Sequence, residues 1–438
     1  MRFFARLGRA FASRPPPATR AVLQASAIPI SGAAAATATA AMAVYSSTVS
    51  TLEAAPDVPE EARLGAHHVR GANGETIRFR NRHPSAGVAP PSTFAMLGKI
   101  LWAQLTGAMR FPDTSAVEIP TAAPDFRTAR TGSTALRATW LGHACYLVEF
   151  PSGLRVLFDP VFEDRCAPVQ WLGPRRYSPP ACALADLPPV DAVVISHSHY
   201  DHLSHTSVRA LAERNPAAHF FVGLGLESWF RASGISRVTE MDWWQDAEFV
   251  LHKDEARSAG AVDAAAAPDT IVARITCFPC QHSSGRTISD KDRTLWASWA
   301  VASGGKSVWF GGDTGYRRVP EVPADVDDYG PAYDSLPRCG QFRDIGALRG
   351  PFDLGLIPIG AYRPRWLFSW MHANPYDAVE IFKDTRCKQA MGIHWGTWAL
   401  TTEDVEEPPR LLREALKKSG IAETGVFDVC AVGETREF

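Results

Sequence analysis

The sequence reads Ser196-His197-Ser198-His199-Tyr200-Asp201-His202-Leu203-Ser204 directly after the apolar run of residues 190–195. A short apolar run of this kind predicts a buried strand, which places the histidines at the end of that strand. Three imidazoles and a carboxylate within six residues are ligands that zinc binds in proteins. The pattern H-x-H-x-D-H therefore predicts a metal site and disfavours the alternative of a solvated loop that is merely rich in histidine.

The spacing within this stretch predicts two ions rather than one. Side chains alternate along a strand, so His197 and His199 point to the same side and can reach one ion if the strand end stays extended. The chain then turns, and Asp201 and His202 can address a second ion. A carboxylate among the ligands suits the harder ion of a pair.

Strand-like and helical patterns alternate along the chain, which indicates an α/β protein built in layers. We expect three parts. Residues 1–53 form a targeting segment, residues 54–135 form a linker and an N-terminal extension, and residues 136–438 form a catalytic domain. A single catalytic domain of this length is compatible with two sheets flanked by helices.

Beyond the histidine stretch, the chain resembles the N-acylphosphatidylethanolamine-hydrolysing phospholipase D family of the metallo-β-lactamase superfamily. H-x-H-x-D-H is similar to the superfamily signature, and it implies the metallo-β-lactamase fold, an αββα sandwich of two mixed sheets flanked by helices. The similarity begins near Phe79 and continues in residues 139–144, 159–162, 281–282, 311–316, 358–366 and 393–397. The run at 358–366, with His372 behind it, is similar to the lipase family in particular.

The resemblance implies a ligand set for two Zn²⁺ ions per chain. One ion would be held by His197, His199 and His282, and the other by Asp201, His202 and His394, with Asp313 bridging them. Asp313 follows two glycines at the end of a strand-like run, where the absence of side chains lets the backbone approach both ions. A metal-bridging hydroxide would hydrolyse N-acylphosphatidylethanolamine to N-acylethanolamine and phosphatidic acid.

Several residues are candidates for substrate contacts. We hypothesise that Tyr200 and His372 contact the phosphodiester or its leaving oxygen. Gln170 and Trp171 resemble a substrate-lining segment in which the family more often has a tyrosine at the second position. Met371 replaces a polar amide of the family, and the aromatic patch at 366–371 reads either as core or as a surface for an acyl chain.

Other residues keep two interpretations. Asp159 could orient a ligand histidine from outside the ligand set or simply end a strand. His143, inside a strand-like run at 138–150, is a core histidine by itself, and only the resemblance places it near the site. Cys277 and Cys280 form a single C-x-x-C, which we interpret as packing. The insertions at 253–269 and 317–350 read as a surface loop and as a segment that could change substrate access.

The N-terminus differs from the rest of the chain. Five arginines and no acidic residue precede Glu53. This composition is typical of a mitochondrial transit peptide, with a disordered low-complexity tail as the alternative. Residues 27–45 could also serve as a marginal membrane anchor. Apolar residues at helical spacing in 95–109 predict an amphipathic helix, which either packs on the core or dips into a bilayer.

Composition and family resemblance together suggest partners. A net charge of −2 and 46% hydrophobic residues describe a globular protein without a bias towards nucleic acid. We expect a membrane phospholipid substrate, contact with a membrane surface, and a mitochondrial location, or else another intracellular membrane. The resemblance implies a homodimer. Two rival functions remain: a hydrolase of a small polar ester, lactone or phosphodiester, and a membrane-bound lipid-binding protein with a vestigial site.

Overall fold

The computed structural model describes residues 43–52, 57–87, 98, 102, 106–107, 109–261, 263, 265–287, 289–323 and 326–438. Contacts group the described residues from Ala43 to Phe438 into one compact unit. Most of the expected targeting segment, including nearly all of the candidate anchor, and most of the helix expected at 95–109 lie outside the described residues.

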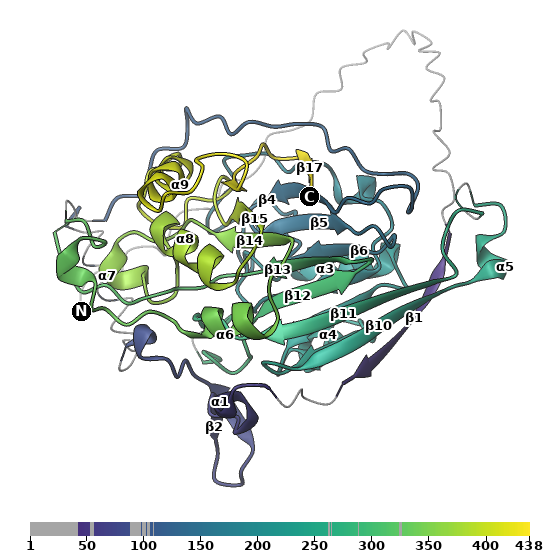
Figure 1. The fold of residues 1–438 in the computed structure, drawn as a ribbon, viewed down its shortest axis with the longest axis horizontal. Helices are drawn as coiled ribbons and strands as arrows, with labels where there is room; N and C mark the ends of the chain where they lie inside the picture. The colour runs from purple at the N-terminus through teal and green to yellow at the C-terminus, as the bar shows by residue number, and fades with distance from the viewer. Residues whose placement is uncertain are drawn as a thin grey trace, which may run out of the picture. The chain divides into compact units, whose positions relative to one another are not determined.

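Two mixed sheets form the frame of this unit (Figure 1). The first sheet is antiparallel from β1 to β13 and parallel from β13 to β16. Its strand order is β1 (Tyr45–Thr51), β10 (Asp246–Lys253), β11 (Thr270–Phe278), β12 (Ser298–Ser303), β13 (Lys306–Phe310), β14 (Leu354–Pro358), β15 (Gln389–Ile393) and β16 (Phe427–Asp428).

The second sheet is antiparallel from β17 to β6 and parallel from β6 to β9. Its strand order is β17 (Thr435–Glu437), β4 (Arg137–Gly142), β5 (Cys145–Glu149), β6 (Arg155–Phe158), β7 (Ala192–Val194), β8 (His219–Gly223) and β9 (Val238–Met241). A separate hairpin pairs β2 (His68–Arg70) with β3 (Thr76–Phe79).

The main hydrophobic core lies between the two sheets. Phe158 of the second sheet and Phe310 of the first belong to one buried cluster, and their ring centroids are 4.8 Å apart. Val193 and Leu157 belong instead to a second cluster together with Val208 of a helix. The second sheet is therefore buried on both faces, which explains why its central strands read as continuous apolar runs.

Helices cover the outer faces of the sheets. In Figure 1, α6 (Gln341–Leu348), α8 (Pro375–Asp384) and α9 (Glu407–Lys418) group together, and α8 packs on β14. Val208 and Leu211 of α3 (His205–Arg214) cover the second sheet. The shorter elements are α1 (Glu60–Arg63), α4 (Glu227–Ala232), α5 (Glu255–Ser258), α7 (Arg365–Phe368), η1 (Pro84–Ala86), η2 (Leu184–Asp186) and η3 (Pro331–Tyr333). The expected α/β class, with two mixed sheets flanked by helices, is confirmed. Among the described residues, none of the helices is long and apolar enough to cross a membrane.

The folded unit extends further towards the N-terminus than the expected start at residue 136. β1 comes from the segment assigned to targeting, and its Ser47 and Val49 pair with Leu251 and Phe249 of β10. β2 and β3 come from the segment assigned to a linker. β1 has no strong apolar alternation, because it lies at the edge of the sheet and buries mainly Tyr45.

Both insertions pack against other parts of the unit. In the 253–269 insertion, Ser258 accepts a hydrogen bond from the backbone of Val44, next to β1. In the 317–350 insertion, Asp328 accepts a hydrogen bond from Arg365, which also pairs with Asp377 of α8. This network fastens the second insertion to α8.

Arg130, within the expected linker, forms a buried ion pair with Asp191 of the catalytic region. Its two terminal nitrogens lie 2.7 and 3.0 Å from the two carboxylate oxygens of Asp191.

We predict that Arg130→Met lowers the free energy of unfolding by about 3–5 kcal/mol, because the change leaves a buried carboxylate unpaired. Urea denaturation measures the effect. Arg209→Met is the control, since Arg209 pairs only with Glu213 on an exposed helix face. Equal stability of the two variants would contradict this role for Arg130.

Candidate metal centre

The histidine stretch lies between β7 and α3, where both ends are fixed. The strand ends at Val194, and the helix begins at His205, with the Ser204 side chain accepting a hydrogen bond from the backbone of Ser207. Such an N-cap satisfies one of the free amides of the first turn. The four ligand-type side chains therefore occupy a short loop that the sheet and the helix hold at either end.

The first expected group of ligands comes together. Nε2 of His197 and Nδ1 of His199 are 2.8 Å apart, and Nε2 of His282 lies 3.2 Å from the same nitrogen of His199. His282 arrives from the segment that follows β11. All three ligand nitrogens lie within 4.8 Å of one another.

The second expected group also comes together, with an additional member. Oδ2 of Asp201 lies 3.4 Å from Nε2 of His202 and 3.4 Å from Nε2 of His394, which follows β15. His143 joins them, since its Nε2 lies 3.1 Å from the same oxygen. The run expected at 138–150 is divided by a turn, and His143 sits in that turn with a positive φ of 53°. His143 thus lies at the site.

Asp313 lies between the two groups. Its Oδ2 is 3.1 Å from Nε2 of His394 and 3.6 Å from Nε2 of His282, and its Oδ1 is 3.2 Å from Nε2 of His202. The preceding Gly312 permits this approach, because a Cβ there would lie 2.5 Å from the Cβ of Ser196. One carboxylate can therefore reach cations in both groups.

The residues fit bound cations because polar atoms at this centre are buried without hydrogen bonds. Unpaired buried polar groups are rare in folded proteins and call for a partner. Among the described residues, the buried atoms that lack a hydrogen-bond partner include Nδ1 of His143, Nε2 of His202, Oδ1 of Asp313, Nδ1 of His372 and both ring nitrogens of His394. Imidazole nitrogens and carboxylate oxygens form the donor set that zinc prefers.

Electrostatics divides the centre into two halves. Burial acts to lower the pKa of His202, but the carboxylates of Asp313, Asp201 and Asp159 together outweigh it and hold that pKa well above the ordinary value. Against the effect of burial, Asp313 and Asp201 together raise the pKa of His394 to about 9. In the other half, burial holds the pKa of His197 and of His282 well below the ordinary value, which keeps both neutral and ready to ligate. Cations bound beside the carboxylates would replace protons there.

Asp159 orients the second group from outside. Its Oδ2 accepts hydrogen bonds from Nδ1 of His202 at 2.6 Å and from the hydroxyl of Ser196 at 2.5 Å. Its Oδ1 accepts one from the backbone of Ser196 at 2.7 Å. These bonds leave Nε2 of His202 facing the centre, as in carboxylate–histidine pairs at metal sites.

Sequence reasoning missed two supporting residues in the segment taken as a linker. The side-chain amide of Asn81 donates to the carbonyl of His282 at 2.7 Å. The hydroxyl of Ser85 donates to Oε1 of Gln281 at 2.5 Å. Nothing in the composition of residues 54–94 marks them. Only the similarity that begins near Phe79 pointed to this region.

The expected substrate residues are placed differently from one another. His372 lies at the centre, with Nδ1 3.8 Å from Oδ2 of Asp313. The hydroxyl of Tyr200 donates to the carbonyl of Arg286, whose guanidinium lies 4.0 Å above the tyrosine ring. Gln170 bonds to the backbone of its own loop, and Trp171 is 77% exposed. Among the described residues, neither Gln170 nor Trp171 makes a hydrogen bond or a ring contact with a candidate metal ligand.

The patch at 366–371 is mostly core, since Leu367, Trp370 and Met371 are buried. Cys277 and Cys280 are buried in the main core as free thiols. Burial raises the pKa of both thiols well above the ordinary value. The burial of Cys277 and Cys280 agrees with the interpretation that the two side chains serve core packing.

Several known proteins have sequences similar to this one. The model of the β-lactamase superfamily domain matches residues 154–395. An N-acyl-phosphatidylethanolamine-hydrolyzing phospholipase D of Caenorhabditis elegans is 39% identical over 287 residues, covering 64% of this chain and 70% of the relative. The chain belongs to this phospholipase family, within the β-lactamase superfamily. The membership confirms the expected enzyme class, a metal-dependent hydrolase.

Two further relatives extend the comparison. An uncharacterized protein of Mycobacterium tuberculosis is 35% identical over 374 residues, which are 83% of this chain and 86% of the relative. A Saccharomyces cerevisiae protein named as the mitochondrial N-acyl-phosphatidylethanolamine-hydrolyzing phospholipase D is 28% identical over 275 residues, covering 63% of this chain and 50% of the relative.

We predict that Asp159→Asn lowers metal affinity and hydrolytic activity roughly 10–100-fold, because an amide cannot accept from both His202 and Ser196 as the carboxylate does. Bound metal is measured by plasma mass spectrometry after dialysis against a weak chelator. Asp186→Asn, at an exposed position, serves as the control. If both variants retain the metal of the unaltered protein, Asp159 only ends its strand.

Proposed function

We propose that this protein is a zinc-dependent phospholipase D that hydrolyses N-acylphosphatidylethanolamine to N-acylethanolamine and phosphatidic acid. The observation that carries the proposal is the gathering of ligand-type side chains into two adjoining groups with Asp313 in reach of both. The similarity to the worm enzyme selects the substrate among those that such a centre can hydrolyse.

In this proposal, each group of side chains holds one zinc ion. One group is His197, His199 and His282, the other is Asp201, His202 and His394, and Asp313 is shared. Two zinc ions would lower the pKa of a water held between them and neutralise charge on the phosphate oxygens. Hydrolysis adds the water oxygen to phosphorus and breaks the bond to the ethanolamine oxygen, which leaves with a proton. The chain itself need not supply a nucleophile.

His372 is the side chain best placed to contact the reacting group. Its unpaired Nδ1 is buried beside Asp313, so a phosphodiester oxygen at the centre would lie within reach of a hydrogen bond. Tyr200 could contact the substrate only if its hydroxyl gave up the bond to the Arg286 carbonyl. We therefore assign the contact with the leaving oxygen to His372.

Contact with a membrane surface is proposed for the loop that carries Gln170 and Trp171. Trp171 is 77% exposed and Leu172 is 61% exposed, and Arg175 beside them is also exposed. Aromatic and aliphatic side chains next to arginine suit the boundary between lipid headgroups and acyl chains. The loop is linked to the metal centre, because Arg176 lies over Trp398 and Trp398 contacts the ring of His143. A lipid held by this loop would be near the candidate metal ligands.

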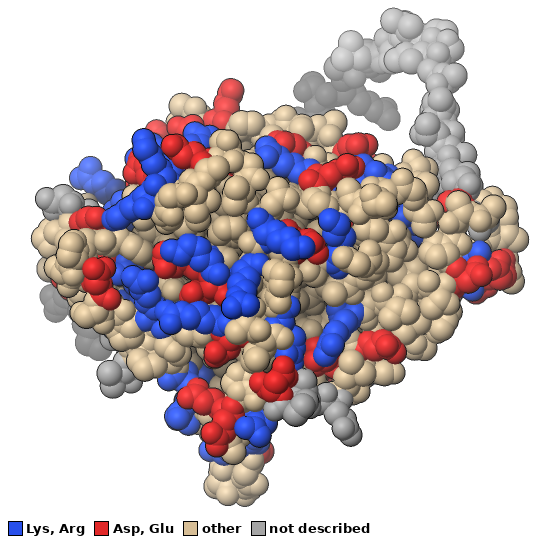
Figure 2. All heavy atoms as spheres, in the orientation of Figure 1, with Lys and Arg blue, Asp and Glu red and all other residues tan. Residues whose placement is uncertain are grey.

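We propose a mitochondrial, membrane-associated location. The acid-free, arginine-bearing start of the chain supports it, as does the mitochondrial designation of the yeast relative. A homodimer remains a proposal from the family. We propose no nucleic-acid partner, since acidic and basic side chains are intermixed over the face seen in Figure 2 and the net charge is −2.

A second candidate is a hydrolase of a smaller ester or phosphodiester. The burial of Leu367, Trp370 and Met371 favours it, because these side chains do not offer an open surface to an acyl chain. Hydrolysis of N-acylphosphatidylethanolamine by the purified protein separates the two functions.

We expect the zinc-loaded protein to release N-acylethanolamine and phosphatidic acid from mixed micelles of N-acylphosphatidylethanolamine, as detected by mass spectrometry. Asp313→Asn should abolish both products, because the bridging carboxylate is lost. His372→Ala should lower turnover roughly 10²-fold with bound zinc unchanged, as expected when a hydrogen bond to the reacting group is lost.

Absence of product from the folded, zinc-loaded protein would favour the second candidate. Loss of zinc from His372→Ala would instead make His372 a ligand and remove its assigned role.

We also expect Trp171→Ala combined with Leu172→Ala to weaken sedimentation with phosphatidylcholine vesicles that contain N-acylphosphatidylethanolamine. The loss should be about tenfold or more, since burying one such side chain is worth about 1.5–3 kcal/mol. Leu64→Ala is a matched control, because Leu64 is 72% exposed elsewhere on the chain. Equal binding by both variants would exclude the loop as the membrane contact.

A further inference from the structure

We propose that the protein binds another divalent cation of the zinc class, held by His67, His68 and Asp242, outside the catalytic groups. His67 and His68 begin the β2–β3 hairpin, and Asp242 lies in the turn between β9 and β10. The inference does not depend on which substrate the enzyme hydrolyses.

The three side chains converge on one point. Nε2 of His67 lies 2.7 Å from Oδ1 of Asp242, and Nε2 of His68 lies 2.8 Å from Oδ2. The ligand atoms of the group lie within 4.8 Å of one another. Two imidazoles and one carboxylate are the protein ligands of many zinc sites, with a fourth position left for water.

The catalytic centre provides a comparison within the same protein. There, the nitrogens of His197 and His199 are 2.8 Å apart, and Asp313 lies 3.1 Å from His394. The separations around Asp242, of 2.7 and 2.8 Å, are equal to or shorter than the smaller of these. Ligand atoms at zinc distances of about 2.0–2.2 Å lie roughly 3.3–3.6 Å apart around a tetrahedral ion, so each ring would move away from Asp242 by about half an ångström or more on binding.

Neighbouring groups orient both rings. Nδ1 of His68 lies 2.8 Å from the hydroxyl of Thr76, which leaves Nε2 for the cation. The ring of His67 stacks on Trp243, with centroids 4.3 Å apart and planes inclined by 22°. Ligand histidines at metal sites are usually held through a hydrogen bond of their second nitrogen, as His68 is by Thr76.

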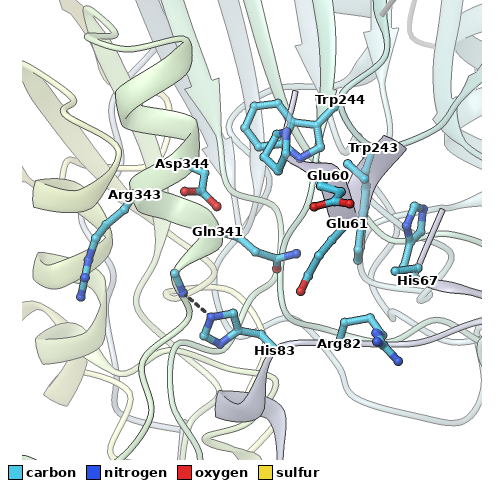
Figure 3. A pocket seen from close by; sticks show the side chains of 14 residues that line it. Glu60, Glu61, His67, Arg82, His83, Trp243, Trp244, Gln341, Arg343 and Asp344 are labelled. Carbon is cyan, nitrogen blue, oxygen red and sulfur yellow. Dashed lines mark hydrogen bonds between the residues drawn. The ribbon is translucent and has the colours of Figure 1, made fainter. Parts of the chain in front are cut away.

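The group lies beside a cavity, which His67 lines. His67 lines a cavity of about 390 Å³ together with the carboxylates of Glu60 and Glu61. Figure 3 shows both glutamates in the same hollow as His67, close to the two tryptophans Trp243 and Trp244. The cavity lining carries the carboxylates of Glu60, Glu61 and Asp344 against the guanidinium groups of Arg82 and Arg343, which leaves a small excess of negative charge. The alternative is a purely hydrogen-bonded group in which each imidazole donates a proton to Asp242.

A cation here would support the catalytic centre at a distance. It would join the segment of residues 57–87 to the domain that contains Asp242. The same segment carries Asn81 and Ser85, which hold the backbone of His282 and the side chain of Gln281. Figure 3 also shows His83 of this segment accepting a hydrogen bond from the backbone of Gly340. The cation would therefore be structural.

The test locates zinc directly. In crystals of the full-length protein grown with zinc, anomalous scattering at the zinc edge should show a peak between the three side chains, besides those at the catalytic groups. In solution, His68→Gln should bind one zinc ion per chain fewer than the unaltered protein. His219→Gln should bind the same number, because His219 bonds only to the hydroxyl of Thr239.

Peaks confined to the catalytic groups, or an equal zinc count for His68→Gln and the unaltered protein, would overturn the proposal and leave the hydrogen-bonded group. The crystal measurement needs no variant, so it decides the question even if His68→Gln fails to fold. Substrate turnover plays no part in either readout, which keeps this outcome separate from that of the proposed function.

Discussion

The structure depends on the burial of a carboxylate that must be matched by positive charge. Asp313 is 2% exposed and faces imidazoles from three other segments of the chain. Removing a carboxylate from water costs several kcal/mol unless cations or charged donors surround it. His202 and His394 can offset the desolvation cost of Asp313 only if strand ends from both sheets meet. The packed core between the sheets holds these strand ends together. The packing of the two sheets and the assembly of the metal centre therefore depend on each other.

The backbone at the centre is also constrained. His143, Asp159 and His394 all have positive φ values, of 53°, 38° and 63°. Such conformations are unfavourable for residues with side chains and persist where the surroundings impose them. Here the hydroxyl of Thr397 accepts from the amide of His143, and the carbonyl of His143 accepts from the amide of His394. Local strain is therefore held by bonds between segments distant in sequence.

The origin of each contact decides how much the sequence could predict. His197 and His199 could be paired from spacing alone, because alternation along a strand is local. His282, Asp313 and His394 come from distant strand ends, so only resemblance to a family grouped them. His143 stayed ambiguous because the turn at Gly142, with a φ of 106°, interrupts a run that reads as one strand. Other features could not be predicted from the sequence for a similar reason. Asn81 and Ser85 act through long-range hydrogen bonds, and β1 is an edge strand without a clear apolar pattern. For these residues a tertiary contact, and not local propensity, determines the conformation.

The order of strands in the second sheet bears on how this enzyme can be divided. β4 and β5 precede the segment matched by the superfamily model, and β17 follows it, yet β4 and β5 lie next to β6 and complete one continuous sheet. A fragment limited to residues 154–395 would lose these strands and the turn that carries His143. It would expose the apolar faces of Phe158 and Leu157 along a bare strand edge. Such an edge pairs readily with other chains, so the fragment would aggregate rather than fold as a smaller hydrolase.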